Sequence, residues 1–438
     1  MGDTPAKIFL RRWCPEHGEA SICIASDARF YWLAQGNPRN ATALSPLERA
    51  TAKDECCSGH ACCASTGGSS GTLGRNANGR GEGPFEKLST CLALIEIVDS
   101  CNLACPTCYA DSPAGSGDAV RAKSLADLKQ RIQGVIDRKG GIEILQLSGG
   151  EPTLHPEFFA LLDWVQHHPK IDYVLINTNG VRIAGDDEFL RHLAVAAGRR
   201  RLQLYLQFDG VQDQGQHFLR GADLRALRGR AIEKCAVIGL PVTLAMTVTR
   251  ENLNWLWPAI EFGLQFSNVR GICFQPLFRS GRLPRVPAEA RLNTADILLA
   301  AVEQSKGRLR HEDFTPLPCG DPNCATIGYL LKVNGRTHSV SDFIDFTQVQ
   351  NFLRDKVRYS LEDLVRCGCE SEPLGEMLKR FEMDESNTFR ILIKPFMDAL
   401  TWDEDRIDRC CTHVIRPDGK LDSFCRYYSG FADLKAEP

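Results

Sequence analysis

The sequence predicts an α/β protein: a partial (β/α)6 barrel with a Cys-rich segment before it and a Cys-rich module after it. From Leu92 onward, short aliphatic and β-branched runs alternate with longer segments of helical period. Such alternation is typical of βα units that pack around a parallel sheet. It stops after about Pro287, and cysteines cluster on both sides of it. We therefore expect the barrel between two cysteine-containing parts of the chain.

The elements of the barrel are predicted from these runs. The expected strands are Leu92 to Val98, Ile142 to Leu147, Tyr173 to Asn177, Gln203 to Phe208, Val242 to Val248 and Arg270 to Phe274. The expected helices are Ser124 to Arg138, Pro156 to His167, Asp187 to Ala197, Leu224 to Ile238 and Leu253 to Gly263. Ligands of such a barrel are expected at the carboxyl ends of its strands and in the loops that follow.

The chain divides into four expected parts. Residues 1–66 form a Cys-containing segment, expected to be a truncated metal-binding module, and residues 67–84 form a linker rich in Gly and Ser. Residues 85–286 form the barrel, and residues 287–438 form the C-terminal module. A length of 438 residues exceeds one average domain, and a hydrophobic content of 43% suffices for a sizeable core.

Charge and hydropathy exclude several classes of protein. The formal net charge of -3 provides no basic field for a nucleic-acid backbone. No apolar run is long enough to cross a bilayer, and the N-terminus lacks the pattern of a secretory signal. We therefore expect a cytoplasmic protein without a transmembrane segment. In that reducing compartment, the 19 cysteines are candidates for metal or redox chemistry rather than for disulfides.

Three cysteines follow the first expected strand in one short loop: Cys101, Cys105 and Cys108. Three thiolates in such a loop can hold three irons of a cubane cluster, whereas four cysteines would saturate it. The fourth iron then remains open to a small molecule. The alternative, a structural zinc site, needs a fourth Cys or His at a matching spacing, and the loop contains none.

This loop resembles the signature of the radical S-adenosylmethionine (SAM) superfamily, with Tyr109 in the aromatic position after the third cysteine. After the second strand, Gly149, Gly150 and Glu151 resemble the GGEP motif of that superfamily. The resemblance implies that this motif receives the amino group of SAM. Glycines allow a close approach of the backbone, and a carboxylate can accept hydrogen bonds from an ammonium group.

Polar residues after the third, fourth and fifth strands complete the implied SAM site. They are Asn179, Gln207, Asp209 and Thr247. The resemblance implies contacts with the ribose and carboxylate of SAM, while Asn179 beside Gly180 also fits ordinary turn chemistry. Arg279 and Arg282 follow the sixth strand, where they either reach a ligand or belong to a solvated loop.

The resemblance also implies the chemistry. A [4Fe-4S] cluster with one open iron binds SAM, and a donor such as a flavodoxin or ferredoxin supplies an electron. SAM is then cleaved to a 5'-deoxyadenosyl radical, which abstracts a hydrogen atom from an unactivated C–H bond. The cofactors perform the difficult step, and the protein orients them and excludes solvent and oxygen.

The C-terminal module contains seven cysteines, from Cys319 to Cys425. Auxiliary iron-sulfur clusters are the expected use of so many thiols in a reducing compartment, and zinc is the rival. The predicted ligands are Cys319, Cys324, Cys369, Cys410 and Cys425. Cys367 or Cys411 can instead be merely packed.

Over nearly its full length, the chain resembles the archaeal tetraether lipid synthases and their bacterial relatives, a group also described as dihydropterin methylases. The resemblance rests on Cys14 to Gly18, Thr90-Cys91, Cys319 to Cys324, Phe396 to Ala399, Cys410 to His413 and Pro417 to Gly419. The group's N-terminal Cys-x-x-Cys pair is absent, and its cysteine-rich segment is altered at residues 55–63. We expect that the chain begins inside the ancestral N-terminal module. An in-frame Cys-x-x-Cys codon pair upstream of Met1 would support this.

Several functions remain open. The first is hydrogen abstraction from a lipid chain with carbon–carbon coupling, which requires an apolar channel and peripheral membrane contact. Aromatic and aliphatic candidates for that channel, which can equally be core residues, are Phe262, Phe266, Phe274, Leu277 and Phe278. The alternatives are methylation of a small dihydropterin-like molecule, a peptide-modifying maturase, and a non-catalytic iron-sulfur protein, because fold alone does not fix function.

Overall fold

The structure is a computed structural model that describes the greater part of the chain. The described residues are 5–16, 18–31, 90–199, 201–284, 286–317, 320–333, 336–339, 342 and 387–429. Five of the sequence-based predictions lie outside them: the 67–84 linker, the altered segment 55–63, Cys319, Cys367 and Cys369.

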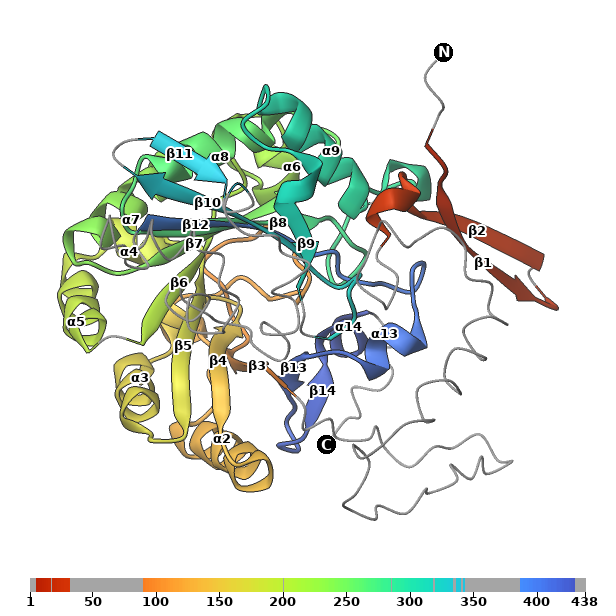
Figure 1. Ribbon diagram of the computed structural model, residues 1–438. Helices are drawn as coiled ribbons and strands as arrows, with labels where there is room; N and C mark the ends of the chain where they lie inside the picture. The colour runs from red at the N-terminus through yellow and green to blue at the C-terminus, as the bar shows by residue number, and fades with distance from the viewer. Residues whose placement is uncertain are drawn as a thin grey trace, which may run out of the picture.

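Six parallel strands form the wall of a barrel, as the sequence predicts. They are β3 (Leu92–Val98), β4 (Ile142–Gly149), β5 (Ile171–Thr178), β6 (Leu202–Gln207), β7 (Val242–Val248) and β8 (Val269–Pro276). Each pairs with the next along the chain, and Figure 1 shows them arranged around a central space. Their aliphatic and β-branched residues explain this arrangement, because such residues favour parallel strands that are covered on both faces.

The C-terminal module continues the same sheet at both edges of the barrel. β12 (Thr388–Ile393) pairs in parallel with β8, and β13 (Thr412–Ile415) pairs in parallel with β3. The remaining strands of this sheet are antiparallel: β9 (Phe314–Pro316), β10 (Thr326–Val333), β11 (Arg336–Ser339) and β14 (Leu421–Ser423). The region after Pro287 is therefore built onto the barrel wall, whereas the sequence suggested a separate module.

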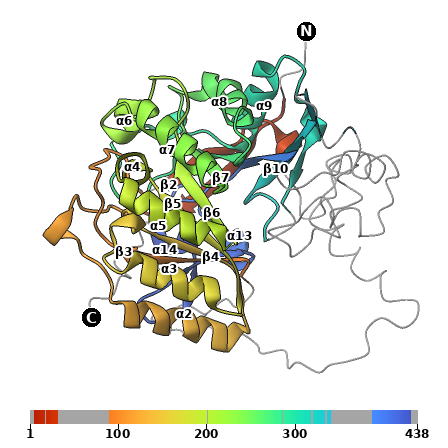
Figure 2. The same cartoon turned by 90° about the vertical axis from the view of Figure 1, so that its left-hand side faces the viewer.

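Helices cover the outside of the barrel, as the side view in Figure 2 shows. The longer ones are α2 (Leu125–Lys139), α3 (Phe158–His167), α5 (Asp187–Gly198), α7 (Arg225–Val237), α8 (Leu256–Leu264) and α9 (Thr294–Gln304). All but α9 match predicted helices. The sequence analysis missed four short helices: α4 (Val181–Gly185), α6 (Gln216–Arg220), α13 (Glu404–Asp408) and α14 (Phe424–Tyr428). No helix of the described residues is both long enough and apolar enough to cross a membrane.

The helix α2 illustrates how local sequence sets these bounds. The Ser124 side chain accepts a hydrogen bond from the Asp127 N–H and caps the first turn. Gly140 ends the helix in the left-handed conformation, with φ of 94°. Leu128 and Ile132 lie on one face of the helix and are fully buried in the main core, which lies between the sheet and the helices.

An N-terminal hairpin packs against the C-terminal part of the chain. β1 (Ile8–Cys14) and β2 (Gly18–Ala25) are antiparallel, and Figure 1 shows them beside the barrel. The Arg12 side chain donates to the carbonyl oxygen of Ala399 at 2.6 Å. The Ser26 N–H donates to the Asn293 side chain at 3.2 Å. These contacts join the first described residues to the barrel.

Candidate active site

A large cavity lies inside the barrel and reaches the loops that follow its strands. Its volume is about 380 Å³, and side chains of β3 to β8 and β12 line it. The signature cysteines Cys101, Cys105 and Cys108 line it as well, together with Gly149 and Glu151. The carboxyl ends of the strands, where ligands are expected, therefore frame this cavity.

The cysteine loop is held by contacts with the segment that follows β8. Cys108 exchanges two backbone hydrogen bonds with Arg282, at 2.8 and 2.9 Å. The Arg282 side chain donates to the carbonyl oxygens of Cys105 and Ser112, both at 2.9 Å. Arg282 therefore fixes the loop, whereas the Arg279 side chain donates to the carbonyl oxygen of Val286.

The donor set of the loop fits a thiolate-bound iron-sulfur cluster. The N–H groups of Leu103 and Ser112 point at the Sγ atoms of Cys101 and Cys108, at 3.4 and 3.5 Å. Burial raises the pKa of the Cys101 thiol to about 12, so an iron must displace its proton. Nowhere in the described ranges do three His, Cys, Asp or Glu side chains converge where one metal ion would sit. Cysteine ligands of a cubane bind different irons and need not converge.

Gly149 and Gly150 bring the loop after β4 against the loop after β3. The φ of Gly149 is 122°, which favours glycine. A Cβ at Gly149 would overlap the carbonyl oxygen of Val98, and a Cβ at Gly150 would overlap that of Ser100. The Gly150 N–H donates to the Val98 carbonyl at 2.8 Å. The glycine pair thus forms a cradle of bare backbone beside the cysteine loop.

The Glu151 carboxylate joins the loops after β4 and β5. Its Oε1 accepts from the Thr153 hydroxyl at 2.7 Å and the Thr178 hydroxyl at 2.8 Å, and its Oε2 accepts from the Asn179 N–H at 2.8 Å. Burial raises the pKa of Glu151, and these hydrogen bonds oppose the rise. Oε2 can accept another hydrogen bond, so the carboxylate is able to receive an ammonium group from the cavity.

Asn179 makes the turn contact that the sequence allowed and also lies beside the cysteine loop. Its Oδ1 accepts from the Val181 N–H at 3.0 Å, which is a turn contact. Its Nδ2 donates to the Asn102 side chain at 2.7 Å and lies 3.7 Å from the Sγ atom of Cys101. Asn179 also lines the cavity.

Asp209, expected to contact SAM, does not line the cavity. Its fully buried carboxylate pairs with Arg220 at 2.6 Å and with Arg228 at 3.3 Å. Burial raises the pKa of Asp209, but the two guanidinium charges outweigh this effect and the pKa is lowered. The sequence analysis missed Arg220, which is supplied by α6 and lines the cavity in its place. An Asp that is buried at the end of a strand requires a cationic partner, so the position of Asp209 in the sequence indicated that a cation lies nearby.

Arg220 also connects the other residues predicted near SAM. Its side chain donates to the Thr247 hydroxyl at 3.0 Å and to the Thr107 carbonyl at 3.3 Å. Its charge opposes the rise that burial causes in the pKa of Cys105. Thr247 lines the cavity, as does Gln207, whose side-chain oxygen accepts from Arg228 at 2.8 Å.

Tyr109 lies in a cluster of aromatic rings between the cysteine loop and α14. Its ring centroid is 4.9 Å from that of Tyr428 and 5.6 Å from that of Phe424. Its hydroxyl lies 3.5 Å from the Ser148 hydroxyl, and burial raises the pKa of Tyr109 to about 12. The aromatic residue of the signature thus lines the cavity and contacts the C-terminal module.

A second group of thiols faces the same cavity from the C-terminal module: Cys324, Cys410 and Cys425. Burial raises the pKa of the Cys425 thiol to about 12, and the other two thiols add to the rise. The Arg406 side chain lies 3.6 Å from the Sγ atom of Cys324. The structure therefore brings together three of the five predicted auxiliary ligands.

The neighbouring Cys411 differs from these thiols. Cys410 is a free thiol, whereas Cys411, which the sequence suggested could be merely packed, is disulfide-bonded. The remaining predicted ligands, Cys319 and Cys369, lie outside the described residues.

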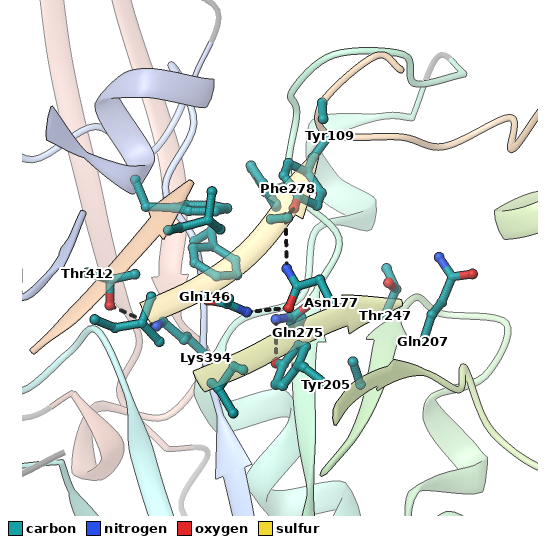
Figure 3. Close-up of a pocket in the computed structure, with 18 of the residues that line it drawn as sticks. Tyr109, Gln146, Asn177, Tyr205, Gln207, Thr247, Gln275, Phe278, Lys394 and Thr412 are labelled. Carbon is teal, nitrogen blue, oxygen red and sulfur yellow. Dashed lines mark hydrogen bonds between the residues drawn. The ribbon is translucent and has the colours of Figure 1, made fainter. Parts of the chain in front are cut away.

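Amide and hydroxyl side chains form part of the lining of the cavity, as Figure 3 shows. The Gln146 side chain donates to Asn177, which donates to the Ser148 hydroxyl at 3.0 Å. The Gln275 side chain donates to the Tyr205 hydroxyl at 2.8 Å. The sequence analysis missed this lining, although single amides at alternate positions of apolar strands indicate a polar interior.

The chain is similar to several known proteins. A model of the radical SAM superfamily matches residues 95–263. The chain is 24% identical to a 7,8-dihydro-6-hydroxymethylpterin dimethyltransferase of Methanocaldococcus jannaschii, over 96% of this chain and 88% of the relative. It is 30% identical to the mycofactocin maturase MftC of Mycobacterium ulcerans, over 37% of this chain and 41% of the relative. The solved structure of Streptococcus suis SuiB bound to S-adenosylmethionine has a TM-score of 0.37 at 17% identity, with 50% of this chain and 46% of that chain covered.

The family match runs from β3 to α8 and includes the cysteine loop, the glycine cradle and Arg220. The cofactors of this superfamily are a [4Fe-4S] cluster and SAM, which agrees with three cavity-facing thiols beside a backbone cradle. This chain therefore carries a radical SAM domain at residues 95–263 and is an enzyme of the transferase or synthase type, similar over nearly its whole length to a dihydropterin dimethyltransferase.

Proposed function

We propose that the chain is a radical SAM methyltransferase that acts on a nitrogen heterocycle of the dihydropterin type. The observation that carries this proposal is the set of amide and hydroxyl side chains in the barrel interior. Gln203 donates to the Thr243 hydroxyl and accepts from the Tyr173 hydroxyl at 3.2 Å. A pterin ring presents donors and acceptors along its edge, and amides match both kinds of group.

Amide groups in the wall of the cavity suit a heterocycle better than an alkyl chain. Burying amides against a lipid without new hydrogen bonds costs free energy. Of the residues considered for a lipid channel, Phe262, Phe266 and Phe274 belong to the core or pack against it. Leu277 and Phe278 do line the cavity. The dihydropterin methyltransferase of M. jannaschii, which matches most of this chain, supports the same substrate class.

Different residues of the chain would hold the cluster and SAM in such a reaction. When bound, the cluster supplies the electron that cleaves SAM. The loop after β3 and Arg282 hold the cluster ligands, and the cradle with Glu151 holds the amino group of SAM. Arg220 lies beside Cys105, where its fixed positive charge can attract the carboxylate of SAM. The proposal includes a flavodoxin or ferredoxin as the reductant and a cytoplasmic location, since exposed clusters need a reducing compartment.

The proposal also includes an auxiliary iron-sulfur cluster at the second thiol group. Cys324, Cys410 and Cys425 come from separate segments and line the same cavity as the signature loop. The N–H of Met397 donates to the Sγ atom of Cys425 at 3.3 Å, a contact that favours a thiolate.

Lipid radical chemistry is the second candidate. The aromatic residues Phe278, Phe396 and Phe424 line the cavity and pack on one another, with ring centroids of Phe396 and Phe424 4.3 Å apart. Such a rim would suit an alkyl chain that passes toward the signature cysteines.

The two candidates differ in their products. The full chain, loaded anaerobically with iron and sulfide, is incubated with reductant, SAM and either 6-hydroxymethyl-7,8-dihydropterin or a phospholipid. We expect a methylated pterin together with 5'-deoxyadenosine and S-adenosylhomocysteine. Cys105→Ala should abolish all three products, whereas Cys235→Ala, a buried thiol outside the cavity, should retain them. A modified lipid with an unchanged pterin would contradict the proposal.

A further inference from the structure

We propose that Arg390 binds an anionic group of the substrate, a phosphate ester or a carboxylate, on the β12 side of the cavity. This inference deepens the proposed function, because it adds a charged substituent to the substrate of the same site. It rests on the position of Arg390, on the absence of a protein partner for it within the described residues, and on the charge of the surrounding cavity.

The register of the sheet places Arg390 inside the barrel. Arg390 pairs with Gly271 of β8, and Gly271 pairs with Thr243 of β7. Thr243 and Arg390 both line the cavity. A Cβ at Gly271 would overlap the backbone of Arg390, so no side chain stands between Arg390 and Thr243. Arg390 and Thr243 therefore face the cavity from one level of the wall, with no β8 side chain between them.

The other arginines of the cavity have protein partners. Arg220 pairs with Asp209 at 2.6 Å, and Arg282 donates to carbonyl oxygens of the cysteine loop. Arg390 makes no hydrogen bond or ion pair with any described residue. Arg390 is half-buried and lines the cavity, so its guanidinium is available to an anion that enters the cavity. Arginine offers two parallel donors that match a phosphate or a carboxylate.

The charge of the cavity favours an anion at this wall. Glu151 is the carboxylate among the lining residues of the described part, and it is committed to the loops after β4 and β5. Lys394, four residues beyond Arg390, also lines the cavity and donates to the Thr412 hydroxyl at 3.0 Å. Figure 3 shows Lys394 directed toward Thr412. Arg390 in β12 and Lys394 directly after it thus both line the cavity.

Lys394 has an alternative explanation that does not extend to Arg390. The Lys394 charge acts on Cys410 of the second thiol group, so it can offset the charge of an auxiliary cluster. Arg390 lies about 13 Å back along the extended strand, since each residue advances about 3.3 Å. It is paired with Gly271 there, in the layer of Thr243 and the amide network. The substrate is therefore the better-placed partner for Arg390.

The test is direct binding to the anaerobic, cluster-loaded full chain by titration calorimetry. The probes are inorganic pyrophosphate, malonate, neutral 6-hydroxymethyl-7,8-dihydropterin and the phosphate ester of that pterin. Arg390→Gln should weaken binding of the phosphate ester by about tenfold or more and leave the neutral pterin unchanged, as expected for the loss of charge-assisted hydrogen bonds. Arg390→Lys should retain part of the preference. Arg336→Gln, an exposed arginine of β11, is the control and should behave as the parent.

The two free anions identify the source of the charge. Tighter binding of pyrophosphate than of malonate, lost in Arg390→Gln, assigns a phosphate, and the reverse order assigns a carboxylate. Equal binding of all probes to parent and Arg390→Gln would overturn the inference. An equal loss of binding for neutral and charged pterin would also overturn it, provided that the variant keeps the parental iron content and unfolds at the parental temperature. Binding of an anion that depends on Arg390, without any binding or methylation of a pterin, would contradict the proposed function but not the role of Arg390.

Discussion

The carboxylate of Asp209 determines where two arginines lie. It pairs with Arg220, which enters the cavity, and with Arg228, which is fully buried in α7. Burial lowers the pKa of Arg228 to about 10, and the Asp209 charge opposes that shift. Asp209 therefore acts as a positioning residue, since it fixes the cation beside Cys105 without facing the cavity itself.

Replacing Asp209 should be severely destabilising. Asp209→Asn leaves two buried guanidinium groups without their anion, and breaking such pairs costs about 3–5 kcal/mol of the free energy of unfolding. Denaturant unfolding of the purified chain measures this loss. The matched control is Asp223→Asn, because Asp223 pairs with Arg225 on the surface and exposed pairs contribute little. Similar losses in both variants would show that the buried pair has no special role.

The second thiol group makes a separate prediction about iron. Cys324→Ala, Cys410→Ala and Cys425→Ala should each reduce the iron content of the reconstituted chain from about eight to about four atoms, since each removes a ligand of a four-iron cluster. Iron and sulfide analysis with electron paramagnetic resonance of the reduced protein provides the measurement. Cys273→Ala, at a buried thiol in β8, is the control and should keep the parental content. An unchanged iron content in the three variants would exclude an auxiliary cluster at this group.

At the scale of elements, the loops after β3 and β4 function as one unit. The register between β3 and β4 shifts where Val98 meets Gly149, and the backbone of the glycine pair closes against Val98 and Ser100. The segment after β8 holds the opposite side of the cysteine loop through Arg282. Three connections from different parts of the barrel therefore position the signature cysteines.

A methyl group in this cradle should separate the loops. Gly150→Ala places a Cβ on the carbonyl oxygen of Ser100, and overpacking of this kind costs about 1–3 kcal/mol. We expect a lower midpoint of thermal unfolding and weaker binding of SAM, measured by differential scanning fluorimetry and equilibrium dialysis. Gly185→Ala in α4 meets no atom within 4 Å and serves as the control. Normal SAM binding in Gly150→Ala would contradict the cradle.

At the scale of the whole molecule, the C-terminal module completes the barrel wall. β12 covers the edge of β8, and β13 covers the edge of β3. It also supplies Arg390, Lys394 and the second thiol group to the cavity. Core residues of β12 such as Phe389 and Ile391 are fully buried. Folding and the cavity thus depend on residues far apart in the sequence.

A chain that ends at Val286 should therefore fail to fold independently. Removing β12 and β13 exposes the backbone of two long strands, which promotes edge-to-edge aggregation. We expect an insoluble product, or a soluble one without a cooperative unfolding transition by circular dichroism, while the full chain unfolds cooperatively. A soluble fragment with a sharp transition would show that the barrel forms without the module.

The sequence predicts the barrel strands closely because hydrophobic periodicity is a local property. β3 and β7 have the predicted bounds, and the other strands differ by at most two residues at either end. The five-residue helix α6 is too short for a periodic signal, and so Arg220 was missed. The strands β12 and β13, which extend the barrel wall on either side, were missed because nothing local indicates which distant strand they join.

The sequence by itself determined the order of the βα units, the cysteine loop and the glycine motif, because spacing within one loop is fixed by the chain. Only the tertiary structure decided which charges meet. Asp209 turned out to hold Arg220 rather than a ligand, and Arg390 entered the cavity through its pairing with Gly271. Such contacts depend on sheet register and long-range packing between segments that sequence spacing does not encode.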